Sequence, residues 1–222
     1  MGSYADDALF MSRNNIEYVE LISDDGKSKV MVIPAWQGRV MTTSAAGDEG
    51  DSYGWINYSF IKKRQIDLQF NPVGGEERFW LGPEGGVFSL YFRQGEKQIY
   101  KNWKVPPVLD IEAFKIQSQS KNCICLTKEG CLTNACGTTF YLNIKRTISL
   151  LDINEFAASF NLEFPKDIKA VAYKSDNQIT NIGNESWNKE TGLISVWMLS
   201  MFNPTSATTV FIPYKQSRKG KI

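Results

Sequence analysis

The chain has 222 residues, of which 42% are hydrophobic and 22% are charged, a composition that excludes disordered and coiled-coil proteins. Its 25 basic and 24 acidic residues give a net charge of +1, so no basic surface for nucleic acid or an anionic membrane is expected. Histidine is absent, which excludes a Ser–His–Asp or Cys–His nucleophile and any step that needs an imidazole. We expect one domain over residues 1–222, without a cofactor or a metal ion.

Strand patterns dominate the chain after one predicted helix at residues 6–14, which Asp6 or Asp7 can cap. The first two predicted strands, residues 19–23 and 29–36, flank an Asp-Gly turn that is typical of hairpins. Enrichment in β-branched and aromatic residues indicates the later strands. These cover residues 65–70, 114–120, 123–127, 139–150, 155–164, 169–175, 192–199 and 208–214.

No alternation of strands with long helical patterns occurs, which argues against a doubly wound α/β fold. The predicted fold is therefore all-β, an antiparallel β-sandwich. Two zones, residues 43–60 and 71–107, are expected to be irregular, and long connections of this kind often carry function.

The four cysteines, at 123, 125, 131 and 136, do not have the paired spacing of a zinc site. We expect buried free thiols, with a disulfide as the alternative. The longest strongly apolar stretch, residues 192–202, is shorter than the ~20 residues that a membrane helix needs. The first residues lack the pattern of a signal peptide, so we expect a soluble protein. Its expected location is periplasmic or secreted if a signal peptide was removed, and cytoplasmic otherwise.

Residues 71–86, NPVGGEERFWLGPEGG, are the most conspicuous motif. Glycine pairs allow close backbone approach, while Glu77, Arg78 and Glu84 supply charged partners for hydroxyl groups. Trp80 offers an apolar plane on which a sugar ring can stack. These four residues are the predicted sugar contacts. The alternative is an arginine–glutamate pair that braces the fold, with the tryptophan in the core.

Two nearby stretches and one distant tryptophan provide further sugar-binding candidates. Arg39 lies next to a glycine in AWQGRVMTTS, and YGWINYS supplies Trp55 and Asn57. Trp187 is the fourth of these outer candidates. For each tryptophan, packing in the core is the competing interpretation.

A glycoside hydrolase needs two carboxylates that flank the scissile bond, about 5–5.5 Å or 6.5–9.5 Å apart. Glu77, Glu84, Asp110 and Glu112 are the residues that can supply such a pair.

The stretches QGRVMTTS, SYGWINYSFI, GGEERFWLGPEGG, NWKVPP and CGTTFYLNIKRTISLL resemble a family of Bacteroidetes proteins of uncharacterised activity. That family has been grouped with the galactose mutarotase-like sandwiches. The resemblance extends to residues 208–214 and implies a supersandwich fold with a role related to sugars. It also implies that this chain is an N-terminal portion, and an incomplete sandwich would expose a strand edge that can pair with a second copy. Mutarotases use histidines, which this chain lacks.

The leading expectation is a carbohydrate-binding or carbohydrate-processing protein that serves glycan use, with catalysis left open. A non-catalytic structural or interaction module is the alternative, and a carboxylate-dependent hydrolase or lyase is the third hypothesis.

Overall fold

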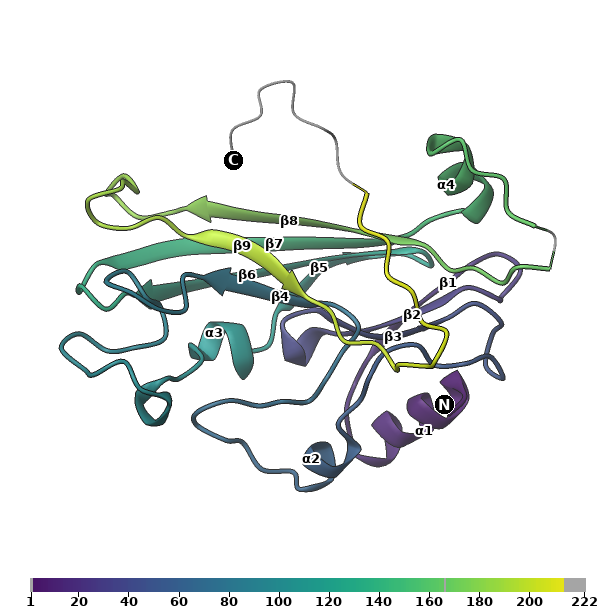
Figure 1. Ribbon diagram of the computed structural model, residues 1–222, viewed down its shortest axis with the longest axis horizontal. Helices are drawn as coiled ribbons and strands as arrows, with labels where there is room; N and C mark the ends of the chain where they lie inside the picture. The colour runs from purple at the N-terminus through teal and green to yellow at the C-terminus, as the bar shows by residue number, and fades with distance from the viewer. Residues whose placement is uncertain (1, 166, 214–222) are drawn as a thin grey trace.

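The computed structural model describes residues 2–165 and 167–213, and over these the fold is mostly β, with several antiparallel sheets and few helices (Figure 1). The strand orders are β1-β2-β3, β4-β9 and β5-β6-β7-β8. The strands are β1 (Val19–Ile22), β2 (Lys29–Ile33), β3 (Arg39–Ser44), β4 (Arg78–Gly82), β5 (Lys115–Gln119), β6 (Cys123–Thr133), β7 (Thr139–Leu150), β8 (Tyr173–Asn181) and β9 (Ser195–Leu199). The helices are α1 (Tyr4–Arg13), α2 (Tyr58–Lys62), α3 (Pro107–Asp110) and α4 (Ile153–Ser159), with short 3₁₀ turns η1 (Pro34–Trp36) and η2 (Tyr100–Asn102).

Strand β2 is buried on both of its faces because two cores meet at the β1-β2-β3 sheet. Val30 and Val32 belong to a larger core that also contains side chains of β4, β6 and β7. The intervening Met31 and Ile33 belong to a smaller core with side chains of α1 and α2. Successive strand residues point to opposite faces, so a continuous apolar run fills both cores.

Strand β7 shows the pattern of a half-buried strand. Phe140, Leu142 and Ile144 point into the larger core, whereas Tyr141 and Lys145 are exposed on the other face. Figure 1 shows β5 to β8 as a long sheet, with α1 and α2 on the far side of the β1-β2-β3 sheet. The larger core therefore joins the sheets through their inward side chains.

Helix α1 confirms the predicted N-terminal helix but not its predicted cap. Ser3 is the N-cap, and its hydroxyl accepts a hydrogen bond from the Asp6 N–H while Asp6 accepts one from the Ser3 N–H. This capping box satisfies two N–H groups that a helix start leaves free. Asp6 therefore lies at the third helical position, and Asp7 is buried within the helix.

Two predicted strands, and the described part of a third, are wrong. Residues 65–70 are irregular because Asp67 and Asn71 side chains hydrogen-bond the local backbone and compete with a strand ladder. Residues 155–164 overlap α4, which Asp152 starts by accepting hydrogen bonds from the N–H groups of Asn154 and Glu155. The described part of the last predicted strand, residues 208–213, is irregular, and residue 214 lies outside the described residues.

All four cysteines are free, and the expectation of burial is correct for only one of them. Cys125 is buried and Cys123 half-buried, whereas Cys131 and Cys136 are exposed. Cys131 lies near the end of β6 and Cys136 in the turn that follows, where the sheet is open to solvent. Over the described residues, no helix combines the length and apolar character needed to cross a membrane.

Candidate functional site

The glycine-rich motif holds β4 close to two other segments. Gly74 and Gly75 have positive φ angles of +95° and +117°. A Cβ on Gly75 would lie 2.5 Å from Cδ of Arg39, and one on Gly74 would overlap the carbonyl oxygen of Trp55. Glycine is therefore required here for close packing as well as for backbone conformation.

Two ion pairs are buried around β4. Arg78 Nη2 donates to Asp110 Oδ1 at 2.8 Å, and Arg146 Nη2 on β7 donates to Glu77 Oε1 at 2.6 Å. Burial lowers the pKa of each guanidinium, and the paired carboxylate opposes that shift. Each pair thus links the motif to a separate element, α3 or β7.

Arg39 is a third buried arginine, and its partners are neutral. Its Nη1 donates to the Gly74 carbonyl at 2.6 Å, and its Nη2 donates to Gln37 Oε1 at 3.5 Å. Burial and the nearby charge of Arg78 lower the pKa of Arg39. This arginine holds the glycine turn against β3.

Trp80 is covered by other side chains and is only 2% exposed. It stacks on Tyr91, with ring centroids 5.5 Å apart, and the guanidinium of Arg78 lies 4.1 Å from its ring centroid. Its Nε1 donates to Glu84 Oε1 at 2.7 Å. The stacked series continues from Tyr91 to Trp103. The indole therefore packs in the interior and orients Glu84, which is half-buried.

The structure thus brings five predicted residues together and gives them internal partners. Arg39, Glu77, Arg78 and Trp80 are buried, and none of them or Glu84 lines the two hollows described below. In this conformation the four buried side chains brace the fold. Direct contact between any of these five residues and a sugar stays a prediction.

The outer candidates have different environments. The Trp55 side chain is 37% exposed, while its carbonyl accepts a hydrogen bond from Gly75 N–H. Asn57 caps α2 and donates to the Pro72 carbonyl at 2.9 Å. Trp187 lies apart from the motif, edge-on to Phe140 with ring centroids 5.7 Å apart.

Glu76 is a buried carboxylate that has no arginine partner among the described residues. The Thr43 hydroxyl, Oγ1, donates a hydrogen bond to Glu76 Oε2 at 2.9 Å. Burial raises the pKa of Glu76 to about 7, and the hydrogen bonds from Thr43 and Tyr173 only partly oppose that shift. Burial of the Tyr173 hydroxyl, together with the nearby charge of Glu76, raises the pKa of Tyr173.

A surface hollow of about 360 Å³ lies beside Trp187, between the start of β7 and the loop after β8. We call it the Trp187 hollow. Its lining includes Thr139, Tyr141, Asn181, Asn184, Glu185 and Trp187. Asn181 braces the loop, since its Nδ2 donates to the Glu185 carbonyl and its Oδ1 accepts from Gly183 N–H. Within the described part of the chain, no hydrogen bond engages the side chains of Asn184, Glu185 or Tyr141.

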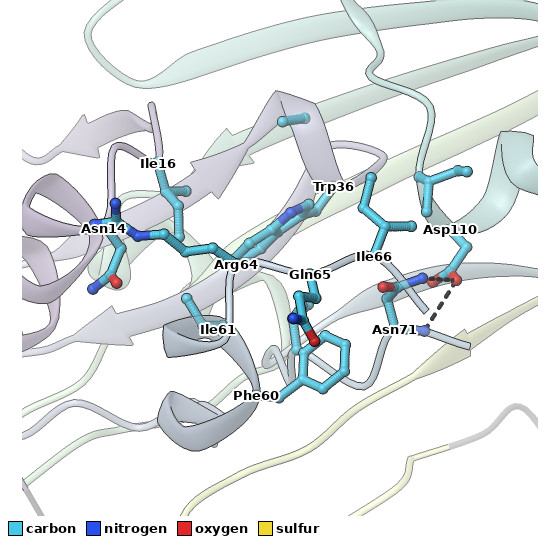
Figure 2. Close-up of a pocket in the computed structure, with 13 residues that line it drawn as sticks. Asn14, Ile16, Trp36, Phe60, Ile61, Arg64, Gln65, Ile66, Asn71 and Asp110 are labelled. Carbon is cyan, nitrogen blue, oxygen red and sulfur yellow. Dashed lines mark hydrogen bonds between the residues drawn. The ribbon is translucent and has the colours of Figure 1, made fainter. Parts of the chain in front are cut away.

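A second hollow, also about 360 Å³, lies where the end of α1 meets η1 and α2 (Figure 2). We call it the Trp36 pocket. Its lining includes Ile16, Trp36, Phe60, Ile61, Arg64 and Ile66. The sequence predictions did not identify either hollow as a whole. The turn NIGNES beside Trp187 and the PAWQG turn are the local signals that mark them.

The four carboxylates considered for hydrolysis are engaged in other contacts. Glu77 and Asp110 are buried in ion pairs, Glu84 accepts from Trp80, and Glu112 pairs with Lys128 Nζ at 2.6 Å. Over residues 2–165 and 167–213, no group of three or more cysteine, aspartate or glutamate side chains is arranged to hold a metal ion.

Comparison with known proteins places the chain in a family. Searches among curated proteins and among solved structures find no match. A family model described as a family of unknown function, DUF6786, matches residues 2–222. The chain belongs to the DUF6786 family.

Proposed function

We propose that this chain is a carbohydrate-binding protein with a mutarotase-like sandwich, and that the Trp187 hollow contacts the sugar. The observation that carries the proposal is the composition of that hollow. Two aromatic rings lie there beside an amide and a carboxylate that have no hydrogen-bond partner among the described residues. Its volume of about 360 Å³ is at the small end of ligand sites, which suits one or two sugar rings.

The chemistry of the lining matches that of a sugar. Tyr141, which is 56% exposed, and the half-buried Trp187 offer apolar ring surface to the C–H face of a pyranose. The Asn184 amide both donates and accepts, and the Glu185 carboxylate accepts charge-assisted hydrogen bonds from hydroxyls. Asn181 fixes the loop that carries both groups, which lowers the entropic cost of binding.

The sandwich part of the proposal is supported by the larger core. Inward residues of the β1-β2-β3 sheet and of β6 and β7 lie in one apolar cluster, as expected when two sheets pack face to face. Mutarotase catalysis is not proposed, because the chain contains no histidine. The hydrolase and lyase hypotheses gain no support from carboxylates that are engaged in ion pairs.

Replacing Trp187 with alanine is expected to weaken binding to the preferred glycan about tenfold or more, because the stacking plane is lost. A glycan array first identifies the glycan, and titration calorimetry then compares the affinities. Glu185→Gln is expected to weaken binding less, since the amide keeps one acceptor.

Trp55→Ala is the control, because Trp55 is 37% exposed but does not line the hollow, whereas Trp187 is half-buried in its lining. It should leave the affinity unchanged. Circular dichroism establishes that each variant is folded, since Trp187 also packs against the larger core. The proposal fails if the folded protein binds no glycan, or if Trp55→Ala weakens binding as much as Trp187→Ala does.

A non-catalytic interaction module is the second candidate, and the sheet edges favour it. Within the described residues, β5 and β8 are the edges of the four-stranded sheet and pair on one side only. Exposed edges can pair with a second copy of the chain. Sedimentation analysis that shows a dimer, combined with an empty glycan array, would favour this candidate over sugar binding.

A further inference from the structure

The Trp36 pocket has an apolar interior built from several elements (Figure 2). Trp36 comes from η1, and Phe60 and Ile61 come from α2. Ile16 comes from the segment after α1 and Ile66 from the segment after α2. Indole and phenyl rings give flat walls, and the isoleucines close the remaining sides. An aromatic or alicyclic ring of a small molecule can pack in such a space.

The charge at this pocket is positive. Arg64 is part of its lining and is exposed. Arg64 Nη2 donates to the carbonyl of Arg13 at 3.1 Å, which fixes the direction of its side chain across the pocket. Its remaining N–H groups have no partner among the described residues. A guanidinium fork of this kind is suited to a carboxylate.

The carboxylate in the lining does not offset this charge. Asp110 accepts from Arg78 Nη2 at 2.8 Å and from Asn71 N and Nδ2 at 3.0 and 2.7 Å. Its charge is balanced internally by Arg78, so it presents no free anion to the pocket. A ligand therefore meets an apolar space with a cation at its rim.

One residue that lines the pocket adopts a costly backbone conformation. Among the described residues, four that are not glycine have positive φ, and of these Arg64, at 51°, lines the pocket. Side chains other than those of glycine and asparagine rarely adopt this conformation, and such strain gathers at ligand sites. Arg64 follows Lys63, the C-cap of α2, a place where a left-handed residue commonly ends a helix.

We propose that the Trp36 pocket binds a small organic anion, a single apolar ring that carries a carboxylate. The ring packs among Trp36, Phe60 and the isoleucines, and the carboxylate pairs with Arg64. The volume of about 360 Å³ admits one ring with a short substituent and excludes long acyl chains. This site is separate from the Trp187 hollow, so its ligand does not compete with a sugar.

The test is a titration of the full chain with benzoate and cyclohexanecarboxylate, followed through the Trp36 indole N–H signal in NMR spectra. Both probes are expected to shift that signal saturably at millimolar concentration. Benzyl alcohol, which lacks the charge, and acetate, which lacks the ring, are expected to bind at least tenfold more weakly.

Arg64→Gln is expected to weaken benzoate binding at least tenfold, and Trp36→Leu to weaken it by a similar factor. Lys63→Gln removes a neighbouring exposed cation outside the lining and should leave the affinity unchanged. Circular dichroism establishes that each variant is folded. The proposal is overturned if the folded protein does not bind benzoate, if benzyl alcohol binds equally well, or if Lys63→Gln weakens binding as much as Arg64→Gln.

Discussion

Replacing Asp110 with alanine is expected to lower the free energy of unfolding by about 3–5 kcal/mol. The reason is that Arg78 would keep its charge in the interior after losing its only carboxylate partner among the described residues. Asn71 would also lose the acceptor of its N–H, and its Nδ2 would keep only the Asp67 carbonyl among the described residues. Urea unfolding, followed by tryptophan fluorescence, measures the change.

Glu112→Ala is the matched control for this prediction. Glu112 also forms an ion pair, with Lys128, but their side chains are 42% and 23% exposed. Exposed pairs contribute about 1 kcal/mol or less, so this change should have little effect. The double variant Arg78→Met, Asp110→Leu should recover most of the loss, since it leaves no unpaired charge. Equal costs for Asp110→Ala and Glu112→Ala would contradict the stabilising role of the buried pair.

The free energy of unfolding is expected to fall as the pH rises from about 4.5 to about 7, because burial raises the pKa of Glu76 to about 7. Over this window the folded protein retains a proton that the unfolded chain has already released. The contribution of Glu76 is therefore complete below about pH 4.5 and lost above about pH 7. The shift corresponds to about 3 kcal/mol.

Glu76→Gln isolates this effect, because glutamine keeps the shape and can still accept a hydrogen bond from Thr43 Oγ1. Urea unfolding at several pH values should show that the stability of the variant relative to the natural chain rises between pH 4.5 and 7. A difference that is independent of pH in this window would show that Glu76 is ionised throughout.

The sequence pattern predicts the strands that carry an apolar period of two or a dense apolar run. The hairpin β1-β2 and the strands β5, β6, β7, β8 and β9 all overlap predicted strands, β8 only at residues 173–175. Strands β3 and β4 were missed because their burial does not depend on an apolar pattern. β3 contains Arg39 and three hydroxyl residues, and β4 begins at Arg78, yet every residue of both is buried. Segments β3 and β4 are strands because they pair with neighbouring strands and their polar side chains find partners in the interior, not because of local residue preference.

The glycine-rich motif shows why its function could not be predicted from residue types. Charged and aromatic residues beside glycines suit a sugar site, but they suit an interior of buried ion pairs equally well. The deciding fact is that Asp110 and Arg146, distant in the sequence, provide the partners of Arg78 and Glu77. Conversely, Trp187 gains its polar neighbours only when the loop after β8 folds beside the start of β7.

The location of sugar contact is the central claim, and the indole N–H signals of the six tryptophans report on it directly. After assignment by single substitutions, the protein is titrated with the glycan that the array identifies. We predict that the Trp187 signal shifts saturably, while those of the buried Trp80 and the exposed Trp55 stay in place. A shift of the Trp80 signal with no change at Trp187 would contradict binding at the Trp187 hollow and would place the sugar at the glycine-rich motif.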